Sequence, residues 1–420
     1  MRTENDTRAA ASATRDVPGT ARTRVLVVGA SASGLATAEA LRRKGYAGRI
    51  TVLGDEPHAP YDRPPLSKQI LSGAWEASRA ALRTQDVLAA LDAEFLLGDP
   101  AVALDPAART VRTESGRVLR ADSVVIATGM RARVLPAPEG GLSGVHVLRT
   151  LDDALTLRRD LLGCSRLVVV GEGVLGSEIA ATARTLGVEV TLAGPLAAPM
   201  ALQVGPLVSQ LLADLHRERG VRLRLGEGVV GLTGQAGGRV AGVRLGSGEV
   251  LPADVVVVAI GATPATEWLA DSGLRLDNGV VCDARCRAAE GIYAVGDVAR
   301  WRHERLDRLV RLENRTNATE QAAAVAGVIC GEDRLYVPVP YFWTDQFDAK
   351  LQVHGFLPTD ADVEVVEGDL AARRFVALYR SGGRVTGVLG WNMPKQTRLR
   401  RQDVVDALAG TAPASLHSPQ

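Results

Sequence analysis

The 420-residue sequence is poor in lysine, and its charges nearly balance. Only four lysines occur, Lys44, Lys68, Lys350 and Lys395, so arginine supplies most of the 49 basic residues. The formal net charge of +1 excludes a general attraction to nucleic acid or to a membrane surface. An acidic partner therefore has to meet a local basic patch.

Cysteine is equally scarce, with four residues at positions 164, 282, 286 and 330. Their wide spacing argues against a disulfide scaffold and favours a reducing compartment. Cys282 and Cys286 are close in sequence, but no second pair or histidine cluster accompanies them. We therefore interpret them as free thiols and predict no metal site.

Long hydrophobic runs are also missing. No run reaches the ~18–20 apolar residues of a transmembrane helix, and the polar segment Met1–Thr20 has no signal-peptide core. We expect a cytoplasmic protein in which residues 1–21 form a disordered leader and residues 411–420 a loose tail.

An internal repeat stands out against this background. Arg24–Gly34 and Leu167–Gly176 each place an apolar run of strand length before a glycine-rich turn and a helical pattern. A second apolar run follows each of them, at Ile50–Leu53 and at Val188–Leu192. This pattern predicts two βαβ units, each buried in a parallel sheet.

Further apolar strands define the predicted domains. Ser123–Gly129 and Val255–Gly261 follow the two units, and Gly291–Asp297 is an isolated strand that we expect to return to the first sheet. We predict a first dinucleotide-binding domain in two parts (22–133 and 276–336), a second one inserted into it (134–275), and a C-terminal α+β domain (337–410). In that last domain we expect strands at Arg374–Tyr379 and Arg384–Leu389 and a closing helix at Gln402–Ala409.

The first unit carries a dinucleotide fingerprint with Gly29, Ser31 and Gly34 at its three positions and Ser33 in the same turn. The turn lets the backbone approach a pyrophosphate, and the following helix N-terminus favours negative charge. Asp55 and Glu56 follow the second strand, where a carboxylate binds a ribose hydroxyl.

The second unit has a complete G-x-G-x-x-G at Gly171, Gly173 and Gly176. After its second strand comes Gly194, where NADH-binding units usually have Asp or Glu. No arginine follows closely to pair with a 2′-phosphate. The residues therefore leave NADH and NADPH both open, and Gly194 predicts a shallow preference.

Two segments give a family resemblance. Pro60–Lys68 (PYDRPPLSK) and Pro340–Gln346 (PYFWTDQ) resemble the signature segments of FAD-dependent NAD(P)H:ferredoxin reductases, the putidaredoxin reductase type that serves P450s and ring-hydroxylating dioxygenases. The resemblance extends over roughly residues 24–409. It implies a glutathione-reductase-like α/β fold, FAD, NADH or NADPH as cofactors with NADH favoured, and electron transfer to a [2Fe–2S] ferredoxin.

The resemblance also implies site residues. Lys68 would lie beside the reactive edge of the flavin and pair with Glu178, while Arg63 would lie near the FAD phosphates. Further cofactor contacts carried over, or assigned from the glycine-ended strands, are Val102, Thr128, Gly129, Arg131, Gly261, Gly296, Asp297, Arg315 and Trp343. The sequence departs from the family at Asn314 and Arg315, where many members have His and Trp.

The basic segment Lys395, Arg398, Arg400 and Arg401 is a predicted docking patch for an acidic ferredoxin. Alternatives stay open at this stage. A non-catalytic or slow redox-sensing flavoprotein of the apoptosis-inducing-factor type shares the scaffold. A disulfide reductase needs a cysteine at the flavin, which residues 1–163 do not contain, and no motif indicates a flavin monooxygenase.

Overall fold

The computed structural model describes residues 23–136 and 141–410. The predicted leader (1–21) and tail (411–420) lie outside the described residues. Among the helices within the described ranges, none combines the length and the apolar character needed to cross a membrane.

The first sheet has six strands in the order β19-β20-β7-β1-β2-β3. Their bounds are Arg287–Ala289, Ile292–Ala294, Ser123–Ile126, Arg24–Val28, Arg49–Leu53 and Ala93–Leu96. The helices of this unit are α1 (Ala32–Arg43), α2 (Gln85–Ala90) and α6 (Arg315–Ile329). The central strands are buried on both faces, which is why they appear in the sequence as continuous apolar runs.

The isolated strand predicted after position 290 returns to this first sheet. β20 pairs in parallel with β7, with Ile292 opposite Val124. The chain therefore leaves the first unit after β7 and re-enters it more than 150 residues later. This topology supports the proposed division of the chain into a discontinuous first domain and an inserted second one.

The second sheet has five strands in the order β12-β11-β10-β16-β9. Their bounds are Arg222–Leu225, Glu189–Gly194, Arg166–Val170, Val255–Val258 and Val145–His146. Its helices are α3 (Leu151–Leu161), α4 (Val174–Thr185) and α5 (Ala201–Glu218), and a small sheet adjoins it with β13 (Val229–Gly234), β14 (Val240–Leu245) and β15 (Val250–Pro252). Together with the first sheet, it confirms the prediction of two Rossmann-type units.

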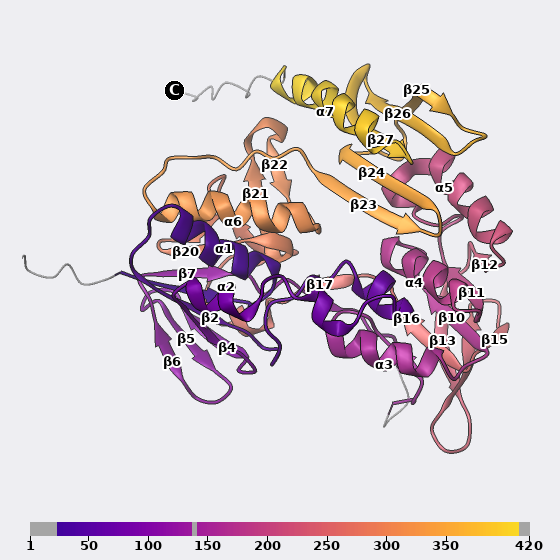
Figure 1. Ribbon diagram of the computed structural model, residues 1–420, viewed down its shortest axis with the longest axis horizontal. Helices are drawn as coiled ribbons and strands as arrows, with labels where there is room; N and C mark the ends of the chain where they lie inside the picture. Colours follow the sequence, from indigo (N-terminus) through magenta and orange to yellow (C-terminus); the bar gives the residue numbers. More distant parts are fainter. Residues whose placement is uncertain (1–22, 137–140, 411–420) are drawn as a thin grey trace, which may run out of the picture.

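Smaller sheets complete the first unit and connect it to the second. One contains β4 (Ala101–Asp105), β5 (Thr110–Thr113) and β6 (Val118–Arg120), and another contains β18 (Val280–Cys282), β21 (Ala299–His303) and β22 (Arg308–Val310). β8 (Met130–Ala132) pairs with β17 (Ala262–Pro264), so a strand that follows the first unit's sheet meets one that follows the second's. The first and second units lie on opposite sides in Figure 1.

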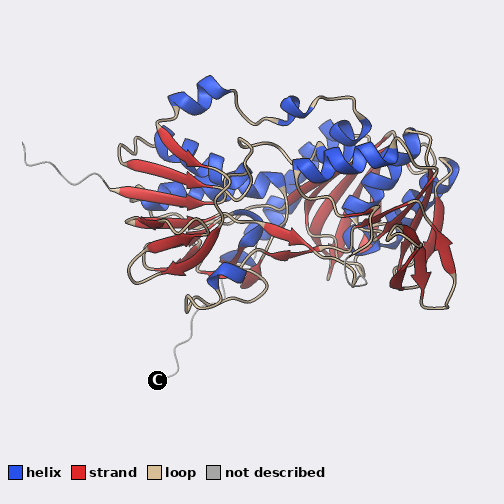
Figure 2. Cartoon of the chain, turned by 90° about the horizontal axis from the view of Figure 1, so that it is seen from below, coloured by secondary structure: helices blue, strands red, loops and turns tan. Residues whose placement is uncertain are grey.

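The C-terminal domain is a five-stranded antiparallel sheet with one helix. The strand order is β23-β24-β27-β26-β25, with bounds Tyr341–Gln346, Ala349–Gly355, Arg384–Trp391, Arg374–Ser381 and Asp362–Asp369. This confirms an α+β domain, which lies at the upper right in Figure 1, above the second unit. Figure 2 shows helices against the sheets at both ends of the molecule.

The closing helix is longer than the sequence pattern predicted. α7 spans Pro394–Ala409 and not only Gln402–Ala409. Pro394 occupies the first turn, where proline is tolerated. Only Thr397 and Val404 of the helix are buried, so its first half has no apolar periodicity that could have predicted it.

Two packing contacts position the site. The turn Leu66–Ile70, which follows the first unit's fingerprint, packs Leu66 and Ile70 into the core of the second unit. The helix α5 of the second unit packs against the C-terminal sheet, where Tyr379 Oη donates to the Val204 carbonyl at 2.6 Å. All three parts of the chain therefore meet around one space.

Candidate active site

A pocket of about 1390 Å³ lies where the two Rossmann-type units and the C-terminal sheet meet. Its lining includes the loops after β1, β7, β10 and β16, at the carboxyl ends of parallel strands, where ligands bind in such sheets. The volume exceeds the ~300–1,000 Å³ of an ordinary ligand site. The pocket therefore has room for an extended dinucleotide.

The turn after β1 forms a backbone cradle. Gly29 has φ +120°, and a Cβ there would lie 2.2 Å from the Ala127 carbonyl oxygen. A Cβ on Gly34 would lie 1.8 Å from the Gly29 oxygen. Ser31 is the N-cap of α1 and makes no side-chain capping bond, so the first N–H groups of the helix stay available for a phosphate. Ser31 and Ser33 line the pocket.

The turn after β10 repeats this geometry. Gly171 has φ +112°, and a Cβ on Gly176 would lie 1.8 Å from the Gly171 oxygen. Gly173 is the N-cap of α4 without a side-chain cap, and it lines the pocket with Gly261. The structure thus contains two cradles of the shape that FAD and a nicotinamide coenzyme require, and the residues present fit both groups.

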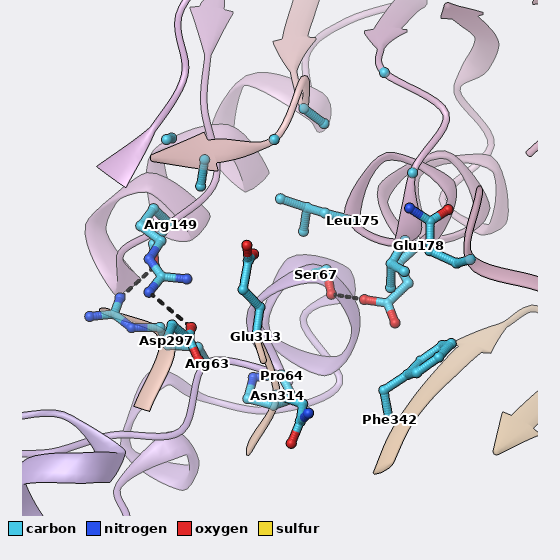
Figure 3. Close-up of a pocket in the computed structure, with 18 of the residues that line it drawn as sticks. Arg63, Pro64, Ser67, Arg149, Leu175, Glu178, Asp297, Glu313, Asn314 and Phe342 are labelled. Carbon is cyan, nitrogen blue, oxygen red and sulfur yellow. Dashed lines mark hydrogen bonds and ion pairs between the residues drawn. The ribbon is translucent and has the colours of Figure 1, made fainter. Parts of the chain in front are cut away.

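Lys68 and Glu178 meet in the pocket, although they lie 110 residues apart. Lys68 Nζ and Glu178 Oε2 are separated by 2.7 Å, and only 12% and 6% of the two side chains is exposed. Ser67 Oγ donates to the same carboxylate oxygen at 2.6 Å, as the close-up in Figure 3 shows. The turn from the first unit and α4 from the second therefore share one buried ion pair.

The C-terminal domain holds the other oxygen of that carboxylate. Thr344 Oγ1 in β23 donates to Glu178 Oε1 at 2.8 Å, and Gln346 Nε2 lies 3.2 Å from Thr344 Oγ1. Gln346 Oε1 bonds His216 Nε2 in α5 at 2.9 Å, and burial lowers the pKa of His216. This hydrogen-bond chain fixes the Glu178 carboxylate from all three parts of the molecule.

A second charged group lies at the other side of the pocket. Arg63 forms a 2.7 Å ion pair with Glu56 and donates to the Arg149 carbonyl. Arg149 lies 3.8 Å from the Asp297 carboxylate. Burial raises the pKa of Asp297 to about 6. In Figure 3 this group faces Ser67 and Glu178, with Glu313 between them.

Asn314 and Arg315, the departures from the family pattern, both have local partners. The Asn314 side chain caps α6 by accepting from the Asn317 N–H at 2.7 Å. Arg315 forms a 2.6 Å ion pair with Asp62. Arg315 lines the pocket, but Asp62 compensates its charge.

Most of the remaining predicted residues also reach the pocket. Its lining includes Thr128, Gly129 and Trp343, and the Trp343 ring stacks on Tyr341 at 5.9 Å. Gly296 lies behind the lining, where its φ of +75° brings its backbone against Ser33. None of the lining residues within the described ranges is a cysteine.

Eight predicted residues are not part of the pocket lining. Four are the glycines Gly29, Gly34, Gly176 and Gly296, which shape the backbone behind it, and the other four are Asp55, Glu56, Val102 and Arg131. Glu56 is engaged with Arg63, which leaves Asp55 as the exposed carboxylate after β2. Arg131 pairs with Glu267 at 3.3 Å, and Val102 is an exposed residue of β4. Their contacts with FAD stay predictions.

Sequence reasoning missed Ser67, Thr344 and Arg149 as site residues. Ser67 and Thr344 stand inside the two signature segments and could have been found from their hydroxyls. Arg149 lies in a connecting segment with no motif, so only the three-dimensional structure brings it to Asp297.

Comparison with known proteins identifies the family of the chain. The model of the pyridine nucleotide-disulphide oxidoreductase family matches residues 23–322, and the reductase C-terminal model matches residues 341–419. The chain therefore belongs to the pyridine nucleotide-disulphide oxidoreductase family, with a reductase C-terminal domain. The predicted family and fold class are confirmed.

Individual relatives show how similar the chain is to particular reductases. The chain is 38% identical to rhodocoxin reductase of Rhodococcus erythropolis, over 90% of this chain and 88% of that protein. It is 36% identical to the ferredoxin–NAD(+) reductase subunit of the benzene 1,2-dioxygenase system of Pseudomonas putida, over 89% and 90%. The reductase in the covalent putidaredoxin reductase–putidaredoxin complex superposes with a TM-score of 0.88 at 36% identity, covering 94% of each chain.

Proposed function

We infer that this chain is an FAD-dependent NAD(P)H:ferredoxin reductase that feeds electrons to a P450 or a ring-hydroxylating oxygenase. The observation that carries this conclusion is the Lys68–Glu178 ion pair, which lies in one pocket between two dinucleotide cradles. Relatives of P450 and dioxygenase systems at 36–38% identity over about 90% of the chain support the same conclusion.

The two cradles have separate roles in this proposal. The turn Gly29–Gly34 would hold the FAD pyrophosphate at the N-terminus of α1, and Asp297 would accept hydrogen bonds from the ribityl chain. The turn Gly171–Gly176 binds the coenzyme pyrophosphate at the N-terminus of α4. Bound FAD supplies the step from a two-electron hydride donor to a one-electron acceptor.

Lys68 and Glu178 orient the reacting rings in this proposal. With FAD bound, the Lys68 ammonium would stabilise the negative charge that the flavin gains on reduction, and Glu178 would hold that ammonium in place. Ser67 and Thr344 fix both oxygens of Glu178. Because most of both side chains is buried, water screens this charge little.

The partner is a ferredoxin, and we propose that it is acidic and docks beside α7. Lys395, Arg398 and Arg401 are exposed on this helix, and Arg400 is half-buried beside Asp403. Arg311 and Arg315 also line the pocket, but they pair with Glu313 and Asp62. The α7 side chains are therefore better candidates than these two for contact with an acidic surface.

We place this reaction in the cytoplasm, because the described cysteines are all unpaired, as is usual under reducing conditions. A disulfide reductase is disfavoured by the cysteine-free lining of the described pocket. Burial raises the pKa of the Cys286 thiol to about 12, so it stays protonated and unreactive.

The test is anaerobic reduction of the FAD-loaded chain by NADH or NADPH, followed by reoxidation with [2Fe–2S] ferredoxins. We expect fast loss of oxidised-flavin absorbance and fast electron transfer to at least one ferredoxin. Slow reduction and a long-lived charge-transfer complex would instead favour the redox-sensing alternative of the apoptosis-inducing-factor type.

A further inference from the structure

A carboxylate from another loop occupies the place of the ribose-binding acid that is missing at position 194. Gly194 ends β11, where a nicotinamide-binding unit usually carries Asp or Glu. A Cβ built on Gly194 would lie 1.7 Å from Glu172 Oε2 and 2.4 Å from Glu172 Cδ. The Glu172 carboxylate therefore occupies the space that the side chain of residue 194 would fill.

Glu172 is the first variable residue of the second G-x-G-x-x-G, and its position is fixed. Its carbonyl accepts from the Met200 N–H at 2.8 Å, and its Oε1 accepts from the Leu196 N–H at 2.6 Å. The backbone of the loop after β11 thus holds the carboxylate beside Gly194. Glu172 and Gly194 both line the pocket.

This carboxylate has no counter-charge in the described part of the chain. Glu172 is 3% exposed, and no lysine or arginine in the described ranges forms an ion pair with it. A buried carboxylate without a cation is costly. Hydroxyl donors from a ligand would offset that cost, whereas a phosphate group would increase it.

The residues around Glu172 also favour a ligand with free ribose hydroxyls over one with a 2′-phosphate. The surrounding lining comes from the loops after β10 and β11, the start of α5 and the turn into β13, namely Gly171–Leu175, Gly194–Leu196, Leu202, Gln203, Gly228 and Val229. These residues include no lysine or arginine. A 2′-phosphate would therefore meet a carboxylate and no cation from these loops.

We propose that Glu172 is the specificity-determining residue for the coenzyme: its carboxylate accepts hydrogen bonds from the adenosine ribose hydroxyls and repels a 2′-phosphate, so the protein selects NADH over NADPH. This inference rests on the proposed use of a nicotinamide coenzyme. It replaces the shallow preference predicted from Gly194 alone, because the acid has moved from the end of β11 to the turn after β10.

Calorimetric titration of the FAD-loaded chain with NAD⁺ and NADP⁺ tests the proposal without relying on turnover. A charged acceptor plus repulsion predicts that NAD⁺ binds roughly 100-fold more tightly than NADP⁺. Glu172→Gln should reduce this ratio about tenfold or more, because the amide loses the charge but keeps an acceptor for Leu196. The control Glu189→Gln, at the exposed start of β11, should leave the ratio unchanged.

A second experiment moves the acid from position 172 to position 194. Gly194→Glu alone should weaken binding of both coenzymes, because its Cβ clashes with Glu172. Glu172→Gly combined with Gly194→Glu returns the acid to its usual place and should restore both binding and NAD⁺ selectivity. A double variant as impaired as Gly194→Glu alone would contradict the shared-site argument.

The outcomes separate this inference from the proposed function. A wild-type ratio near one, or a ratio that Glu172→Gln leaves unchanged, overturns the role of Glu172 even if both coenzymes reduce the flavin. Selective NAD⁺ binding that depends on Glu172, without flavin reduction by NADH, supports the inference and overturns the reductase.

Discussion

Among single residues, Asp297 combines burial with a charge that FAD needs. Burial raises its pKa to about 6, above the ~3.9 of a free aspartate. In the FAD-free chain the folded state therefore binds the proton more tightly, and this group destabilises the fold as pH rises through 6. FAD affinity should change with pH in the opposite direction, because the ribityl hydroxyls need the ionised Asp297 carboxylate as their acceptor.

The dissociation constant for FAD should therefore rise as pH falls below about 6, by at most about tenfold per pH unit. Asp297→Asn should remove this dependence and weaken retention at neutral pH by ~1–3 kcal/mol. Equilibrium dialysis across this pH range measures both effects. The exposed control Asp360→Asn should behave as wild type, and a pH-independent wild type would sink the assignment.

Lys68 acts on hydride transfer and not on FAD binding in this account. Lys68→Ala should slow flavin reduction by roughly 10²-fold or more, a cost of ~3 kcal/mol for a buried charged contact, while FAD stays bound. Stopped-flow absorbance gives the rate, and the flavin spectrum gives the occupancy. Lys44→Ala, which removes the ion pair between the C-cap residue of α1 and Glu332, is the matched control. Reduction as fast as wild type would refute the role of Lys68.

Among the helices, α7 tests the docking proposal. Replacing Arg398, Arg400 and Arg401 with Glu should raise the KM for an acidic ferredoxin, and added salt should raise the wild-type KM in the same direction. Ferricyanide reduction should be unchanged because that small acceptor needs no docking face. Arg112→Glu with Arg120→Glu, at exposed positions of the β4–β6 sheet, supplies a control with the same type of charge reversal. No change in KM would place the ferredoxin elsewhere.

The contact between α5 and the C-terminal sheet tests how the site is supported. Tyr379→Phe removes the buried hydrogen bond to the Val204 carbonyl and should lower the free energy of unfolding by ~1–2 kcal/mol. Denaturant unfolding measures this loss. The rate of flavin reduction should stay near that of wild type, and a large loss of rate would show that α5 acts on the site directly.

For the molecule as a whole, local sequence patterns predicted the strands that consist of continuous apolar runs and the turns that follow them. The strands β1, β7, β10 and β16 and both glycine turns could be predicted because burial on two faces leaves an unbroken apolar signal. The first half of α7 could not, because its exposed side chains have no periodicity. The Lys68–Glu178 pair came from family resemblance, since no local rule joins residues 110 positions apart.

Sequence reasoning did not predict the contacts of Arg149, Thr344 and Glu172. Arg149 reaches Asp297 only through the fold. Thr344 belongs to the aromatic signature segment in the sequence, but its hydrogen bond to Glu178 connects the C-terminal domain to the second unit. Gly194 indicated a missing acid, and only the structure places the Glu172 carboxylate in the same space.

The most direct test of the central claim is the anaerobic mixing of the NADH-reduced, FAD-loaded chain with an oxidised [2Fe–2S] ferredoxin. The account predicts that the ferredoxin is reduced in step with flavin reoxidation, two molecules per flavin, and that Lys68→Ala slows only the preceding reduction by NADH. A flavin that NADH reduces but that passes no electrons to any ferredoxin tested would contradict the account.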